Sequence, residues 1–162
     1  MKIGSKGDYG LRALIDLAEH YGSPRIVQAK EIAERQAIPK DYLALIMIDL
    51  RKAGLVESIR GPGGGYRLAR APKDMTMGQA LTALEGPVTL LDCTTSLGFG
   101  ECSISLRCRM RNVWIEANRA VMAILDSTTI ADLCVPNQSG DDTSKDGKSA
   151  SLNMPEGLTF HI

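Results

Sequence analysis

The sequence predicts a mainly α-helical protein with one small β-hairpin. Within residues 9–53, apolar side chains recur at three- and four-residue spacing, which is the period of amphipathic helices. Residues 55–69 instead alternate apolar and polar side chains on either side of a glycine run, which is typical of a hairpin. The chain has 162 residues, of which 44% are apolar and 23% charged, so it can bury a modest globular core.

Three helices are predicted in the first third of the chain, at residues 9–21, 28–36 and 39–53. Pro39 suits the first turn of the third helix, because its missing N–H needs no partner there. Gly54 stands where a left-handed residue commonly ends a helix. The third helix has four inward-facing positions: Leu43, Ile46, Met47 and Leu50.

Strands are predicted at residues 55–60 and 66–69 around a loop at 61–65, since a run with four glycines forms neither helix nor strand cheaply. Two helices, a tight turn, a third helix and a hairpin are the order of a winged helix-turn-helix. Residues 1–75 are therefore predicted to form a DNA-binding domain.

The charge distribution agrees with this assignment. Residues 1–75 hold 13 Lys and Arg against 9 Asp and Glu, whereas residues 76–162 hold 6 against 10. A basic front half suits a module that binds a polyanion. An uneven solvated surface is the other interpretation of the same counts.

The helix after the turn is expected to lie in the DNA major groove, with its N-terminal residues facing the base edges. Its outward positions are Lys40, Asp41 and Ala44, with Arg51 near the far end. Lys40 can contact phosphate or guanine, and Asp41 can accept from cytosine or simply cap the helix.

Arg60 immediately precedes the glycine run of the hairpin. A tip built from Gly61, Gly63 and Gly64 can approach the sugar–phosphate backbone closely, and an arginine beside it can enter a narrow minor groove. The alternative is a plain turn next to a solvated arginine, although a turn needs fewer glycines.

The second unit, at residues 76–135, is predicted to hold an irregular loop and a long helix. Thr76 and Gln79 have capping-box spacing, which opens a short helix ended by Gly86. A long helix is expected at about residues 105–125, and Thr129 is expected to cap one last turn. The long helix has its apolar face at Val113, Ala117, Ala120, Val121 and Ile124. Residues 136–162 have few apolar anchors and form a predicted disordered tail.

Three cysteines, Cys93, Cys102 and Cys108, lie within 16 residues of one another. Three thiolates from one loop can hold three corners of an iron–sulfur cluster, which prefers soft sulfur ligands. The positive charges of the arginines at positions 107, 109 and 111 would favour the thiolate over the thiol form of these cysteines. The alternatives are structural thiols or a thiol-only redox switch. Cys134 is either a fourth ligand or a buried thiol.

Several segments together resemble the bacterial regulator family that contains IscR, NsrR, RirA and CymR. The resemblance extends over about residues 1–135, and the Arg-Gly-Pro-Gly-Gly-Gly-Tyr segment at residues 60–66 is its most specific part. It also rests on residues 6–9 and 50–56, on Tyr42-Leu43 and on the cysteine triplet. The resemblance implies a homodimer built on the long helix, a pseudo-palindromic double-stranded DNA operator, and control of transcription by cluster state.

Two departures from the family pattern bear on the cofactor and on the bases read. The histidine that IscR carries after its third cysteine falls on Arg111, which cannot ligate iron. NsrR-like members recruit an acid from the partner subunit's first helix, and that position is Asp8 here. The resemblance therefore favours a [4Fe–4S] cluster held by Cys93, Cys102, Cys108 and Asp8, with a [2Fe–2S] cluster as the alternative. At the position where IscR carries a glutamate that discriminates between bases, this sequence has Ala44.

Other classes of function are excluded or kept as alternatives. No nucleophile–base pair, phosphate-binding loop or dinucleotide fingerprint is present, so we expect no enzyme activity. No apolar run has membrane-spanning length and residues 1–6 lack a signal core, which predicts a cytoplasmic protein that does not enter the membrane. The alternative function is a cluster-free regulator of the same fold, controlled by thiol oxidation or by a partner protein.

Overall fold

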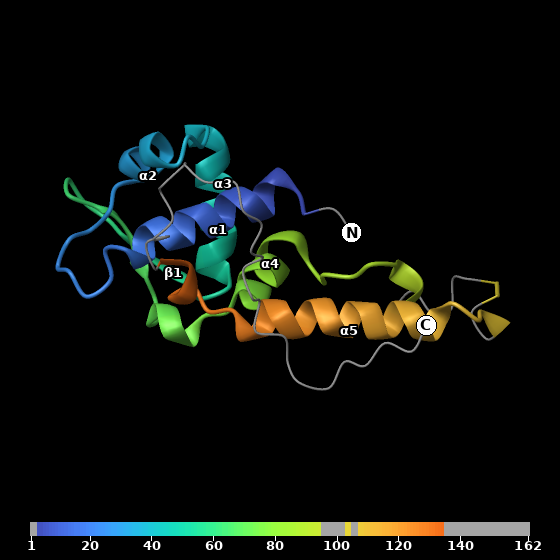
Figure 1. The fold of residues 1–162 in the computed structure, drawn as a ribbon. Coiled ribbons are helices and arrows are strands. Elements are labelled where there is room, and N and C mark those ends of the chain that lie inside the picture. Colours follow the sequence, from blue (N-terminus) through green and yellow to red (C-terminus); the bar gives the residue numbers. More distant parts are fainter. Residues whose placement is uncertain (1–2, 95–102, 105–106, 135–162) are drawn as a thin grey trace, which may run out of the picture.

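Three N-terminal helices pack around one apolar core and carry a two-stranded antiparallel hairpin (Figure 1). The computed structural model describes residues 3–94, 103–104 and 107–134. The helices are α1 (Ser5–Ala18), α2 (Ala29–Arg35) and α3 (Lys40–Lys52), and the strands are β1 (Val56–Ile59) and β2 (Gly65–Leu68). The predicted mainly helical fold with a hairpin wing is confirmed.

The core of this winged region lies where α1, α3 and α4 meet. All four predicted inward positions of α3 are fully buried. Leu14 of α1 and Leu81 of α4 (Met77–Glu85) are also fully buried in the same cluster. The helical spacing of the apolar residues thus decides which face of each helix packs inward.

The first helix begins at Ser5 rather than at the predicted residue 9 and ends at Ala18. Its first turn has a long-range acceptor, because the backbone N–H of Gly7 donates to Glu85 Oε1 at 2.7 Å. Amides at a helix N-terminus have no partner inside the helix, so this carboxylate stabilises the additional turn.

The turn between α2 and α3 is short, as predicted. It contains Ala37 with φ of +52°, a left-handed conformation that is uncommon for a residue with a side chain. Gly54 has φ of +68° just after α3, which confirms the predicted cap. The hairpin pairs Val56 with Leu68 and Ile59 with Gly65.

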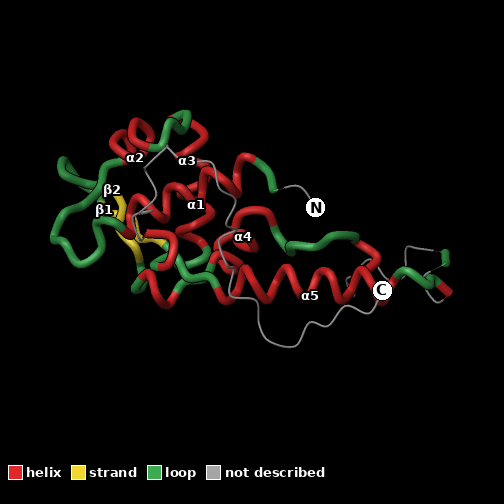
Figure 2. Tube along the Cα trace, viewed as in Figure 1, coloured by secondary structure: helices red, strands yellow, loops and turns green. Residues whose placement is uncertain are grey.

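After the hairpin the chain forms a 3-10 turn, η1 (Pro72–Asp74), and then α4. Thr76 accepts a hydrogen bond from the backbone N–H of Gln79 at 3.2 Å, so the predicted capping box is confirmed. The Thr129 turn is also present, because Thr129 Oγ1 accepts from the N–H of Asp132, which opens η4 (Asp132–Cys134). Among the described residues, the hairpin is the only sheet (Figure 2).

The long helix α5 spans Arg111–Ser127, so the predicted start near residue 105 is wrong. The described residues 107–110 form turns instead of an α-helix. Arginines at 107, 109 and 111 crowd positive charge at the positive end of the helix dipole, which disfavours a helical turn there. Figure 1 shows α5 extending well beyond the winged region. The predicted disordered tail at residues 136–162 lies outside the described residues.

Candidate DNA-binding surface and cysteine site

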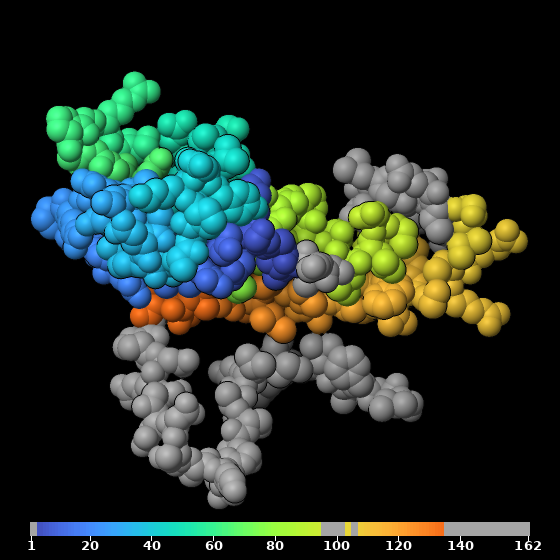
Figure 3. Space-filling view, turned by 90° about the horizontal axis from the view of Figure 1, so that it is seen from above, coloured from blue at the N-terminus to red at the C-terminus, as the bar shows by residue number. Residues whose placement is uncertain are grey.

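The outer face of α3 carries the predicted base-reading residues. Lys40, Asp41 and Ala44 are all exposed, on the opposite side of α3 from its buried stripe. Arg51 is also exposed, and its Nη1 lies 3.4 Å from Ser58 Oγ on β1. That contact joins α3 to the wing, and Figure 3 shows the two side by side on the face turned away from α5.

Two further residues on this face were not singled out from the sequence. Leu45 is 58% exposed and Ile48 is 40% exposed, although both are large and apolar. Their positions two residues away from buried Leu43 and Ile46 place them across the helix from the core. The helical period could have identified them, since both lie outside the inward stripe.

The structure of the wing requires glycine at two positions of its tip, Gly61 and Gly64, but not at Gly63. Gly61 has φ of +118°. A Cβ at Gly64 would fall inside contact distance of the carbonyl oxygen of Ile59. Gly63 has neither restriction, because nothing lies within 4 Å of the position of its Cβ. Arg60, Gly61 and Gly63 are exposed and Gly64 is half-buried, so the predicted tip is open to a ligand.

The N-terminal turn of α1 is held by two polar contacts, which we call the α1 clasp. One is the hydrogen bond from Gly7 to Glu85 at the end of α4. The other is the ion pair between Lys6 Nζ and Asp49 Oδ2 of α3, at 2.7 Å. The hydrogen bond from Lys6 lowers the pKa of the Asp49 carboxyl below its ordinary value. The clasp therefore connects the start of α1 to both α3 and α4.

Asp8, the predicted fourth ligand, lies in the same turn. Its side chain is half exposed, and its Oδ2 lies 2.8 Å from Arg12 Nη2 one helical turn later. The carboxylate is thus accessible from outside the chain, while a cation of its own helix faces it.

The structure describes two of the three predicted cysteine ligands. Cys93 lies in η2 (Asp92–Thr94) and Cys108 lies three residues before α5, and both are half-buried free thiols. The loop before η2 is fixed to α5, because the N–H of Leu90 donates to Asn118 Oδ1 at 3.0 Å. Cys102 lies outside the described residues. Among the residues that are described, no three His, Cys, Asp or Glu side chains lie close enough together to hold a metal ion.

Cys134 packs elsewhere, against α1. Its Sγ donates to the carbonyl oxygen of Ile130 at 3.1 Å, and burial raises the pKa of the thiol. A raised pKa disfavours the reactive thiolate at this half-buried position. His20 Nδ1 lies 2.8 Å from the carbonyl oxygen of Asp16, so this ring serves the end of α1.

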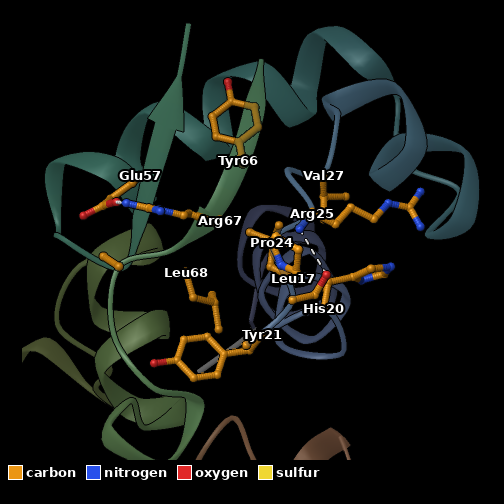
Figure 4. A pocket seen from close by; sticks show the side chains of 13 residues that line it. Leu17, His20, Tyr21, Pro24, Arg25, Val27, Glu57, Tyr66, Arg67 and Leu68 are labelled. Carbon is orange, nitrogen blue, oxygen red and sulfur yellow. Dashed lines mark hydrogen bonds and ion pairs between the residues drawn. The ribbon is translucent and has the colours of Figure 1, made fainter. Parts of the chain in front are cut away.

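A pocket of about 560 Å³ lies between the end of α1 and the base of the wing (Figure 4). Its two arginines are paired, Arg25 with Glu31 and Arg67 with Glu57, each at 2.7 Å. None of the predicted site residues lines this pocket. The pocket therefore lies outside the candidate DNA-binding surface.

The comparisons with known proteins decide the family. The model of the Rrf2 family, described as iron-dependent transcriptional regulators, matches residues 3–136. The chain belongs to the Rrf2 family. The HTH-type transcriptional regulator IscR of Aliivibrio salmonicida (strain LFI1238) is 35% identical to this Rrf2 protein over 153 residues, which are 94% of this chain and 89% of that protein.

Two solved structures of regulators resemble this Rrf2 protein. CymR (YrzC), the global cysteine regulator of B. subtilis, matches with a TM-score of 0.66 and 37% identity, covering 83% of this chain and 96% of that chain. T. potens IscR matches with a TM-score of 0.64 and 38% identity, covering 82% and 85%.

These relatives show that the Rrf2 protein is a DNA-binding transcription regulator and not an enzyme, as the sequence predicted. They also confirm the winged-helix fold. In the part of the chain that the structure describes, every helix is too short or too polar to span a bilayer.

Proposed function

We propose that this Rrf2 protein is a homodimeric regulator that reads a DNA operator with α3 and the wing, and that senses iron, redox state or nitric oxide through an iron–sulfur cluster. The observation that carries the proposal is the continuous exposed surface of α3 and the wing, joined by the contact between Arg51 and Ser58. Such a protein acts in the cytoplasm, where its operator lies.

The residues of this surface have distinct roles in the proposal. Lys40, Asp41 and Ala44 face base edges in the major groove, and Arg51 neutralises phosphate at the far end of α3. Arg60 reaches the minor groove beside the wing. The tip glycines, Gly61, Gly63 and Gly64, let the backbone approach the phosphates.

The DNA part is tested by Arg60→Ala, with Lys73→Ala in η1 as the control outside this surface. Arg60→Ala should weaken operator binding by roughly 1–3 kcal/mol and flatten the salt dependence by about one charge. Fluorescence anisotropy at several salt concentrations measures both quantities. Equal affinity and slope for the two variants would contradict a contact by Arg60.

The dimer part is supported by the surface of α5. Val113 is 66% exposed and Ile124 is 45% exposed, and Ala117 and Ala120 lie between them on the same face. Such an apolar stripe with small central residues suits close packing of a second helix. Val121, by contrast, packs partly against the core of its own chain, so it is a poorer site for testing the interface.

The cysteine loop has donors of the right chemistry for the cluster. Thiolates are the ligands that iron–sulfur clusters prefer, and Cys93, Cys102 and Cys108 would supply three of them. Arg107 and Arg109 are exposed beside Cys108 and would offset negative charge. Asp8 of the partner subunit would supply the fourth ligand. Such a cluster, [4Fe–4S] in preference to [2Fe–2S], would provide iron that reacts with oxygen or nitric oxide.

The α1 clasp offers a route from this site to the operator. Binding of Asp8 to a cluster, or its release, would displace the first turn of α1. That turn is bound to Glu85 of α4 through Gly7 and to Asp49 of α3 through Lys6. Two arrangements of this turn would then shift the recognition helix between two DNA affinities. Interrupting the clasp with Lys6→Met should weaken the response of DNA binding to cluster loss.

The cluster part is tested by visible absorption of anaerobically reconstituted protein. We expect charge-transfer bands, a more labile cluster in Asp8→Ala and an altered spectrum in Asp8→Cys. Glu34→Ala on α2 is the matched control, since this acid is also exposed. If both Asp8 variants match the parent in spectrum and cluster lifetime, Asp8 is not a ligand and serves only its ion pair with Arg12.

A cluster-free regulator controlled by thiols or a partner is the second candidate. It is favoured by the likeness to a protein described as a global cysteine regulator. Colourless protein whose DNA affinity changes on thiol oxidation, and no longer does so in Cys93→Ser or Cys108→Ser, would establish this candidate and overturn the cluster.

A further inference from the structure

The centre of the outer face of α3 is apolar, unlike its ends. Leu45 and Ile48 are exposed there, whereas the apolar residues on the inner face of the helix, such as Ile46, are fully buried. Ile48 lies three positions after Leu45, so the two side chains are neighbours on successive turns. We call this pair the apolar patch of α3.

Polar residues surround the apolar patch. Asp41 lies four residues before Leu45 and Lys52 lies four residues after Ile48, so all four share one line along the helix. Lys40 and Arg51 are exposed near the two ends of α3. Of the four exposed charges, Asp41 is the only anion, and Lys40, Arg51 and Lys52 are cations. An apolar centre surrounded mainly by cations suits a polyanion that itself presents apolar groups, and it does not suit a purely apolar helix partner.

Double-stranded DNA is such a polyanion. In its major groove the apolar group presented by a base is the C5 methyl of thymine, and aliphatic side chains make contact with it. The small side chain of Ala44 beside the patch leaves room for close approach to the base edges.

We propose that Leu45 and Ile48 determine base specificity by contacting thymine methyl groups, so that the sequence bound by α3 carries thymines beneath the patch. The inference rests on the proposed binding of DNA by α3. Three residues of helix advance about 4.5 Å, against about 3.4 Å between base pairs. The two side chains therefore address neighbouring base pairs or pairs one step further apart.

The test begins with duplexes selected from a random pool by the full-length protein. In the selected sequence, each thymine is replaced singly by deoxyuridine, which removes only the methyl group. At the thymines beneath the patch we expect about a fourfold loss of affinity per methyl, equivalent to ~0.8 kcal/mol for one buried methyl-sized group. Replacement of thymines outside the two halves of the selected palindrome is the control, and it should leave the affinity unchanged.

Two variants assign the effect to the patch. Leu45→Ala should bind thymine and deoxyuridine duplexes equally at one position, and Ile48→Ala should do so at another. Leu45→Asn keeps the branched shape but adds hydrogen-bonding groups, so repeated selection should replace that thymine by adenine. A merely structural role of Leu45 would lower affinity without moving the base preference.

The outcomes separate this inference from the proposed function. Sequence-selective binding that is indifferent to deoxyuridine at every position overturns the role of the patch and leaves DNA binding by α3 intact. Dissociation of the dimer by Leu45→Asn would show that a second copy covers the patch, which also overturns it. Failure to select any sequence would overturn both proposals.

Discussion

The two longest helices after α1 are α3 and α5, and they differ in how much of their apolar face their own chain buries. In α3 the whole apolar stripe is buried in the core of its own chain, and Leu45 and Ile48 are the two large apolar side chains left exposed. In α5 only Leu125 is buried, and Val113 and Ile124 remain exposed on the apolar side itself. One helix is thus complete within its own chain, and the other is not.

The residues beside an exposed apolar side chain indicate which kind of partner it suits. On α3 two such residues sit between charged ends, which suits a mixed partner such as DNA. On α5 the exposed residues continue a stripe through Ala117 and Ala120, which suits a second apolar helix. Matched substitutions on the two helices test this division.

The dimer should depend on α5 and not on α3. Ile124→Glu places a charge in the proposed interface, and burying it unpaired would cost several kcal/mol. We expect monomers at micromolar concentration in analytical ultracentrifugation. Ile48→Glu, a matched change on α3, should leave the dimer intact and reduce only DNA binding. A dimer that survives Ile124→Glu would place the interface elsewhere.

Stability should show the reverse dependence. Met47→Ala empties a fully buried position of α3, which should cost about 2–5 kcal/mol in urea unfolding. Ile124→Ala removes an exposed side chain, so the unfolding free energy per chain should change by less than about 0.5 kcal/mol once dimer dissociation is accounted for. Comparable losses in the two variants would mean that the fold of one chain depends on its partner.

The winged region also contains an ion pair between a buried carboxylate, Asp16, and the exposed Arg35, which gives its stability a pH dependence. Asp16 is fully buried and its two oxygens accept from Arg35 at 2.7 and 2.8 Å. Burial raises the pKa of Asp16, but the hydrogen bonds from Arg35 and Gln36 outweigh it, so the net pKa lies below the ordinary 3.8.

A lowered folded-state pKa means that this contribution is fully present above about pH 3.8 and is lost as the pH falls through the folded-state value. Asp16→Asn should therefore cost roughly 1.5–3 kcal/mol at pH 7. The gap between the variant and the parent should narrow in urea titrations below pH 3.8. A gap independent of pH would show that shape, not charge, accounts for the loss.

The smallest expected effects lie in the wing and separate folding from binding. Gly64→Ala brings a Cβ against the carbonyl of Ile59 and should distort the hairpin, costing about 1 kcal/mol or more. Gly63→Ala meets nothing within its own chain, so the melting temperature should stay unchanged. If the tip approaches DNA, Gly63→Ala should still weaken binding; unchanged affinity would remove Gly63 from the interface.

The sequence was most informative where local chemistry decides the structure. The α3 stripe, the Thr76 cap, the Gly54 cap and the hairpin were all predicted from spacing and residue type. Each depends on residues only a few positions apart, so the pattern contains the whole cause. The exposed position of Lys40 followed from the helical period, and that of Arg60 from its place directly before the glycine run.

The order of the elements, their inward faces and the residues available for binding could be predicted from the sequence, because these depend on local propensity and helical period. The start of α1 could not, since the acceptor for Gly7 is Glu85, 78 residues away. It likewise joined Lys6 to Asp49 and left the stripe of α5 uncovered. Such contacts arise from folding the chain back on itself, and no local pattern in the sequence contains them.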